Sequence, residues 1–137
     1  MLTRLDLPLA YYDGAAAVVH GQVIGEDREF CLSTIRFSGG NILLPSSHLR
    51  VGQQVRLRVQ ARDVSLTTEK PVNTSILNAF ETTVINLSPD SNGQVLVELD
   101  AKGTHLLSRI TSKSVNTLKL DIGKPIFAQV KGIAVIE

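Results

Sequence analysis

Residues 122–137 at the end of the chain read I-G-K-P-I-F-A-Q-V-K-G-I-A-V-I-E, and this stretch predicts the fold. Moved back 71 positions without a gap, it falls on residues 51–66, V-G-Q-Q-V-R-L-R-V-Q-A-R-D-V-S-L. In both copies apolar and polar residues alternate after an apolar residue and a glycine, which is the pattern of a strand with one buried face. A small residue, Ala61 or Gly132, interrupts each copy before a second short apolar run. The repeat predicts two related β units that end in the same way.

Composition restricts the class of protein. The 137 residues suit one domain or two small ones, and with 43% hydrophobic residues but only four Phe, two Tyr and no Trp the core must be aliphatic. A formal charge of +1 and few aromatic rings disfavour nucleic-acid binding, which needs a basic face and stacking platforms. The single cysteine, Cys31, is compatible with a reducing compartment, and its place in an apolar run predicts a core position. No signal peptide or membrane-spanning run is recognisable, which indicates a cytoplasmic protein.

The chain divides into a lead-in over residues 1–14, a first β unit over 15–70 and a second over 71–137. In the first unit we expect strands at 15–24, 28–37 and 42–44, with a turn at 25–27 and a hairpin at 38–41; the expected buried positions are Phe30, Leu32, Ile35 and Phe37. In the second unit we expect strands at 79–87, 94–99 and 104–110, with Leu96 on the polar side of its strand.

One short helix is predicted at residues 112–118. Thr111 or Ser112 can cap it, and Val115 and Leu118 give it an apolar face. The predicted fold class is therefore all-β. Two small barrel units that resemble oligonucleotide/oligosaccharide-binding (OB) folds lie in tandem, and the second carries the helix.

Catalytic motifs are not recognisable in the sequence, so we expect no enzymatic activity from this chain and no metal site. Hydroxyl and amide residues with one lysine are the remaining candidates for chemistry: Thr74, Ser75, Asn78, Thr111, Ser112, Ser114 and Lys131. Hydroxyls, backbone N–H groups and a lysine suit a tetrahedral oxyanion. The alternative is that the hydroxyls only cap the helix and Lys131 is solvated.

Three separated motifs carry a family resemblance. Residues 74–78 (T-S-I-L-N), 110–114 (I-T-S-K-S) and 128–136 (A-Q-V-K-G-I-A-V-I) resemble, in this order, the Mop domain, a molybdate-binding module. Residues 61–66 (A-R-D-V-S-L) resemble the segment before that module in the ATP-binding subunit of bacterial molybdate ABC transporters. The resemblance covers about residues 2–137. It implies the C-terminal regulatory (TOBE/Mop) region of that subunit, with the ATPase domain, its ATP and its Mg²⁺ outside this chain.

The resemblance also implies a pocket for molybdate or tungstate, assembled partly across the subunit interface of a homodimer. The implied oxyanion-binding residues are Ser75, Ile76, Leu77, Thr111, Ser114, Lys131 and Gly132, with the backbone acting at Ile76, Leu77 and Gly132; Thr74 and Asn78 would brace the loop. The chain departs from the family at Leu77, where arginine is usual, and at Gly132, where serine or alanine is frequent.

The expected function is a regulatory module that pairs subunits and senses internal molybdate. Its expected partners are a second copy of itself and the membrane permease subunits of the transporter, at the cytoplasmic face of the bacterial inner membrane, with no nucleic acid and no membrane insertion of its own. Two alternatives stay open. One is a free-standing cytoplasmic molybdate-storage protein, and the other is a dimerisation scaffold that has lost its ligand, for which Leu77 is the main argument.

Overall fold

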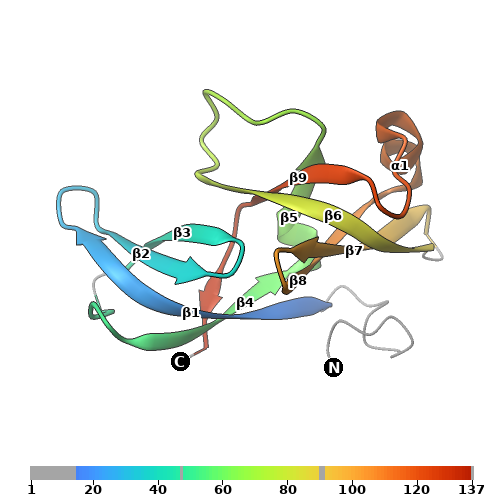
Figure 1. Ribbon diagram of the computed structural model, residues 1–137. Helices are drawn as coiled ribbons and strands as arrows, with labels where there is room; N and C mark the ends of the chain where they lie inside the picture. The colour runs from blue at the N-terminus through green and yellow to red at the C-terminus, as the bar shows by residue number, and fades with distance from the viewer. Residues whose placement is uncertain (1–14, 47, 90–91, 137) are drawn as a thin grey trace.

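The structure is a computed structural model that describes residues 15–46, 48–89 and 92–136, and it consists of two five-stranded antiparallel sheets with one short helix, α1 (Figure 1). The predicted all-β fold class is confirmed, whereas the predicted lead-in over residues 1–14 lies outside the described residues. The bounds of the elements are Ala16–Asp27 (β1), Leu32–Phe37 (β2), Gly40–Pro45 (β3), Gln54–Gln60 (β4), Ala61–Asp63 (η2, a 3₁₀ turn), Val64–Thr67 (β5), Asn78–Pro89 (β6), Gln94–Ala101 (β7), Thr104–Thr111 (β8), Ser112–Leu118 (α1), Pro125–Val130 (β9) and Ala134–Val135 (β10).

The two sheets repeat one another strand by strand. The first has the order β10-β4-β1-β2-β3 and the second the order β5-β9-β6-β7-β8. The long first strand of each half, β1 or β6, has an irregular register just after Val23 or Val84. At these two valines the backbone bonds are also equivalent: Gly52 N–H donates to Val23 O and Gly123 N–H donates to Val84 O, both at 2.7 Å. The predicted repeat of residues 51–66 at 122–137 therefore corresponds to equivalent strands.

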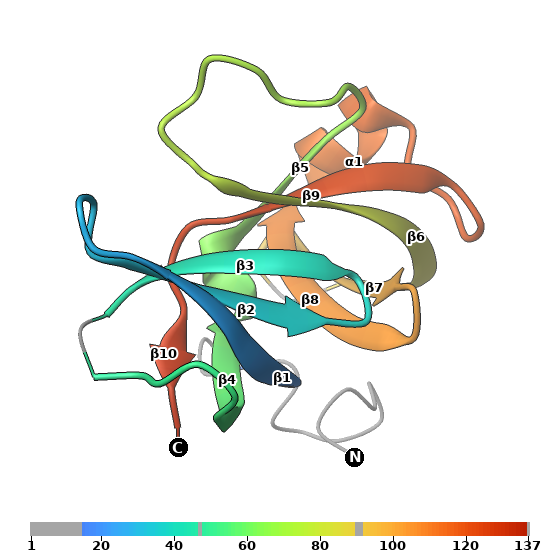
Figure 2. The ribbon, with the colours of Figure 1, turned by 60° about the vertical axis from the view of Figure 1, so that its left-hand side comes forward.

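The last strand of each half is exchanged with the other half. β5 follows β4 in the sequence but pairs with β9 in the second sheet, and β10 follows β9 but pairs with β4 in the first. Figure 2 shows the chain passing from β9 to β10 across the gap between the sheets. The two crossings touch, because the Lys131 N–H donates to the Asp63 carbonyl at 2.9 Å. The small residues at the crossings, Ala61 and Gly132, are those that interrupt the repeat.

The core is aliphatic, as the composition predicts. Its largest fully buried side chains are Leu, Ile and Val from both sheets. Phe37 and Phe80 pack edge-to-face, with ring centroids 5.0 Å apart. A second, smaller cluster joins Leu96 and Leu107 to Ala15, Ala17 and Ala61. Leu96 is thus fully buried rather than on a polar face, because β8 packs against β1 and η2 and Leu96 belongs to the cluster formed there.

Two predictions for the first hairpin are wrong. Phe30 is 66% exposed and Cys31 is an exposed free thiol, although both were expected in the core. The reason is that β1 continues to Asp27, so the turn falls at residues 28–31 rather than at 25–27. Asp27 Oδ1 accepts from the Phe30 N–H at 3.2 Å, and Cys31 has the left-handed φ of 56° that closes the turn. Both side chains therefore lie beyond the end of the paired strands.

Candidate functional site

The start of β6 and the end of β9 bring most of the predicted site residues together. Asn78 pairs with Val130 as the last pair of the β6–β9 ladder, so Leu77 and Lys131 are the residues that continue from this pair. Ser75 and Lys131 are exposed, and Leu77 is 58% exposed. Leu77 and Lys131 therefore lie at the same accessible end of the second sheet, and Ser75 precedes Leu77 by two residues.

The side chains of Thr74 and Asn78 both form hydrogen bonds with backbone groups near this end of the sheet. Thr74 Oγ1 accepts from the Ile76 N–H at 3.2 Å, a short-range turn that uses the Ile76 amide. The Asn78 side chain is buried and forms two bonds with the backbone of Leu43 in β3: its Oδ1 accepts from the N–H at 2.8 Å and its Nδ2 donates to the carbonyl at 2.9 Å. These are the contacts that a bracing role requires, while their effect on a ligand stays a prediction.

Gly132 lies against a carboxylate that the sequence analysis did not include. A Cβ added at Gly132 would lie 2.9 Å from Asp63 Oδ2, so the Asp63 side chain packs on the glycine backbone. Asp63 ends η2 in the first half of the chain and reaches this position only because the two crossings touch. A negative group beside Lys131 and Gly132 opposes an anion there. No feature of the linear sequence indicated this neighbour.

Thr111 and Ser114 form the start of α1. Thr111 Oγ1 accepts from the Ser114 N–H at 3.0 Å and lies 3.0 Å from the Ser114 hydroxyl, so Thr111 is the N-cap, and the predicted bounds of the helix are confirmed. The Ser112 N–H donates to the Gly93 carbonyl at 2.8 Å, which ties the helix to the turn between β6 and β7. Thr111 and Ser112 are exposed and Ser114 is half-buried.

One chain does not bring the two groups of predicted site residues together. Thr111 pairs with Gln94 at the start of β7, and the adjacent Val95 pairs with Pro89 at the end of β6. Asn78 is at the other end of β6, and at ~3.3 Å per residue this 12-residue strand spans roughly 40 Å of chain. Figures 1 and 2 show the same separation, with α1 at one end of the second sheet and the start of β6 at the other.

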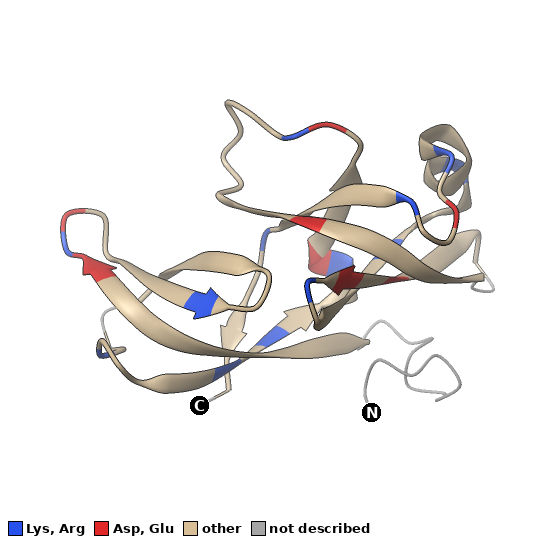
Figure 3. Cartoon of the chain, viewed as in Figure 1, with Lys and Arg blue, Asp and Glu red and all other residues tan. Residues whose placement is uncertain are grey.

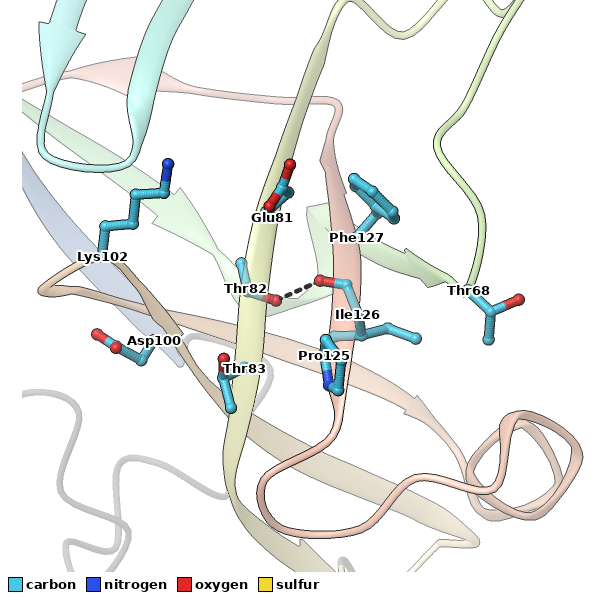
Figure 4. Close-up of a pocket in the computed structure, with 9 residues that line it drawn as sticks. All are labelled: Thr68, Glu81, Thr82, Thr83, Asp100, Lys102, Pro125, Ile126 and Phe127. Carbon is cyan, nitrogen blue, oxygen red and sulfur yellow. Dashed lines mark hydrogen bonds between the residues drawn. The ribbon is translucent and has the colours of Figure 1, made fainter.

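Two adjoining pockets lie on the second sheet, near the end at which β6 begins. The first, of about 430 Å³, is lined by Thr68, Glu81, Thr82, Thr83, Asp100, Lys102, Pro125, Ile126 and Phe127 (Figure 4). The second, of about 370 Å³, is lined by Gly39, Gly40, Asn41, Lys70, Pro71, Ile76, Leu77, Ala79, Phe80, Glu81, Lys102 and Phe127. Figure 3 shows an acidic residue on β6 and, near it, acidic and basic residues at the end of β7 and the β7–β8 turn. The sequence analysis missed both pockets, because their walls come from segments far apart in the chain.

The described residues were also searched for a metal site and for a membrane-spanning helix. Within residues 15–46, 48–89 and 92–136 there is no group of three or more His, Cys, Asp or Glu residues placed to hold a metal ion. Over the same ranges, no helix has the length and apolar character needed to cross a membrane.

Comparison with known families identifies the half of the chain that carries most of these residues. The profile of the TOBE domain matches residues 74–136, which include Ser75, Thr111 and Lys131. Residues 74–136 are therefore similar to TOBE domains. This range includes all the strands from β6 to β10 together with α1, so the match includes β10, which completes the first sheet.

Curated relatives extend the similarity beyond the TOBE domain to the first half. The chain is 46% identical over 99% of its length to the molybdenum import ATP-binding protein ModC of Albidiferax ferrireducens, and 43% identical over 98% to ModC of Pseudomonas syringae pv. tomato. It spans 37% and 38% of the length of these two proteins. Among solved structures, the cytoplasmic molybdate-binding protein ModG with molybdate bound is similar with a TM-score of 0.71 and 26% identity, over 87% of this chain and 92% of that one.

Proposed function

We propose that this chain is the regulatory, oxyanion-binding region of the ATP-binding subunit of a molybdate import ABC transporter. The observation that carries the proposal is the 46% identity over 99% of the chain to a molybdenum import ATP-binding protein. The similarity in fold to a molybdate-binding protein solved with its ligand supports molybdate, or the closely similar tungstate, as the ligand.

The geometry supports a site shared between two copies of the chain. Ser75, the backbone near Leu77, Lys131 and Gly132 form one half of the site, and Thr111 with Ser114 forms the other, at opposite ends of β6. In a homodimer the start of β6 of one copy meets α1 of its partner. Hydroxyls and backbone N–H groups then donate to the oxyanion, and Lys131 supplies a charge-assisted bond, which is about twice as strong as a neutral one.

The remaining activities of the subunit belong to the part of the relatives that this chain does not span. We assign ATP and Mg²⁺ binding, ATP hydrolysis and contact with the membrane permease subunits to that part, at the cytoplasmic face of the inner membrane. We further propose that the chain is divided into a lead-in over residues 1–14, a first β unit over 15–70 and a Mop unit over 71–137. Molybdate binding would favour one arrangement of the paired subunits, to the extent that its affinity differs between the arrangements.

A free-standing molybdate store is the second candidate. It is favoured by the ModG similarity, because this chain aligns with 92% of that molybdate-binding protein. A dimerisation scaffold without a ligand is the third, and it is favoured by the exposed Leu77 at the position of the family's arginine.

Calorimetric titration of the chain with molybdate tests the proposal, with sulfate as the competing oxyanion and light scattering to record the oligomeric state. We expect saturable molybdate binding by a dimer and at least about tenfold weaker binding in Lys131→Ala, since a hydrogen bond to a charged group contributes about 1.5–3 kcal/mol. Arg36→Ala removes an exposed cation from the outer face of β2 and should leave the affinity unchanged. A dimer that binds no molybdate at millimolar concentration would contradict the proposal and favour the scaffold. Indifference of transport by the full complex to internal molybdate would contradict the regulatory role.

A further inference from the structure

The pocket lined by Lys70 and Lys102 overlaps the proposed molybdate site only at Ile76 and Leu77. It lies within one chain, between the segment that precedes β6, the β2–β3 turn, the β7–β8 turn and the faces of β6 and β9. Of the predicted oxyanion residues it contains Ile76 and Leu77, and it contains neither Lys131 nor the residues of α1. Its volume of about 370 Å³ lies within the range of about 300–1,000 Å³ that is usual for small-molecule sites.

The charges of this pocket favour an anion. Lys70 and Lys102 approach it from two separate segments, while Glu81 is its one carboxylate among the described lining residues. Figure 4 shows the Lys102 side chain extending from the β7–β8 turn towards the β2–β3 turn, away from Asp100. The β2–β3 turn and the start of β3 contribute Gly39, Gly40 and Asn41 to the lining, which are further polar groups. A carboxylate or phosphate group between the two lysines would meet donors from three segments.

The rest of the pocket is apolar. Phe80, Phe127, Pro71, Ile76 and Leu77 line it, and Phe80 is fixed by its edge-to-face contact with Phe37. A bare tetrahedral oxyanion would leave these surfaces in contact with water, whereas a ligand with an apolar body would cover them. The lining thus combines two cations with an aromatic and aliphatic surface, a composition suited to a small amphiphilic ligand.

We propose that this pocket binds a small organic anion, with its carboxylate or phosphate group between Lys70 and Lys102 and its apolar body against Phe127 and Ile76. Lys70, Pro71, Ile76 and Leu77 belong to the single segment that also carries Ser75. A ligand in the pocket would therefore contact the segment that carries Ser75. The inference goes beyond the proposed function and does not depend on it, since Lys131 and α1 take no part.

Phenyl phosphate is the probe, and amide chemical shifts in ¹H–¹⁵N NMR spectra of the whole chain are the readout. We expect saturable shifts at Gly39, Gly40, Ile76 and Leu77, with Gly52 and Gly123 unaffected. Lys70→Gln and Lys102→Gln should each weaken binding about twofold to fivefold, the range of a partly exposed charge pair, and the double variant about tenfold. Lys113→Gln, an equal loss of charge on α1, should leave the affinity unchanged. Phenol should bind more weakly than phenyl phosphate because it lacks the anion, and inorganic phosphate because it lacks the ring.

Three results with the unmodified probe and the lysine variants would overturn the inference, and a fourth comes from Lys131→Ala. The three are the absence of shifts at 20 mM probe (about the weakest affinity worth testing) in a folded chain, shifts that persist in the double lysine variant, and equal binding of phenol. Lys131→Ala separates this pocket from the molybdate site. Phenyl phosphate binding that survives Lys131→Ala supports the separate pocket whether or not molybdate binds. Loss of both ligands in that variant would assign the probe to the molybdate site and refute a second one.

Discussion

Replacing Asn78 by alanine should lower the free energy of unfolding by about 3 kcal/mol, because this one side chain joins the two sheets. Its amide forms two hydrogen bonds with the backbone of Leu43, at 2.8 and 2.9 Å, and Asn78 is only 8% exposed. β3 is an edge strand, so the Leu43 N–H and C=O that face Asn78 have no neighbouring strand to pair with. Two neutral hydrogen bonds contribute about 2 kcal/mol together, and incomplete solvation of the half-buried Leu43 groups adds about 1 kcal/mol.

Urea unfolding followed by far-UV circular dichroism measures this loss. The slope with denaturant should stay constant, so that the shift in midpoint reports stability alone. Asn41→Ala is the matched control. It removes an exposed asparagine from β3, the strand that contains Leu43, and should lower the free energy of unfolding by less than about 0.5 kcal/mol. Asn78→Asp should be at least as destabilising as Asn78→Ala, because a carboxylate cannot donate to the Leu43 carbonyl. If Asn78→Ala behaves like Asn41→Ala, water replaces the amide and the link between the sheets does not depend on these two bonds.

Three further substitutions test the packing and the proposed site. Gly21→Ala should destabilise the chain by about 1–3 kcal/mol in the same urea assay, because its Cβ would lie 2.6 Å from Ile35 Cγ2 and 2.9 Å from the Arg36 carbonyl; a neutral result would mean that β1 and β2 separate easily. Leu77→Arg should strengthen molybdate binding about tenfold in calorimetry, since a charge-assisted bond is gained, whereas Leu77→Gln should not, and equal affinities would place Leu77 away from the ligand. Asp63→Asn should strengthen molybdate binding about threefold at low salt and less at 0.5 M salt (where the Debye length is only about 4 Å), because it removes a negative charge next to Gly132; a salt-independent effect would instead indicate a change in packing.

Local patterns in the sequence predicted most of the elements correctly. The period-2 alternation in residues 54–60 and 125–130 corresponds to β4 and β9, because a strand with one buried face imposes that period on its own residues. The helix over Ser112–Leu118 was also predictable, since the capping hydroxyl of Thr111 bonds to an amide three residues away. Both signals lie within a few residues of the elements that they predict.

The wrong predictions concern residues whose exposure is decided by a neighbouring strand. The bulge after Val23 lets β1 continue to Asp27 in register with β2, and this moves Phe30 and Cys31 into an exposed turn. Leu96 lies on the face that the alternation marks as polar, yet it is buried because Leu107 and the alanines at the start of β1 cover it. In both cases the neighbouring strand, not the local pattern, determines exposure.

The sequence by itself determined the strands, the short helix, the repeat of the two halves and the residues proposed to bind an oxyanion. Only the tertiary structure decided that β5 and β10 exchange sheets, because either edge would satisfy the hydrogen bonds of such short strands. The same exchange brings Asp63 to Gly132, and folding brings Lys70 and Lys102 to one pocket. It also leaves Lys131 and Thr111 at opposite ends of β6. These contacts join residues tens of positions apart, so they depend on how whole strands pack together rather than on the preferences of any one segment.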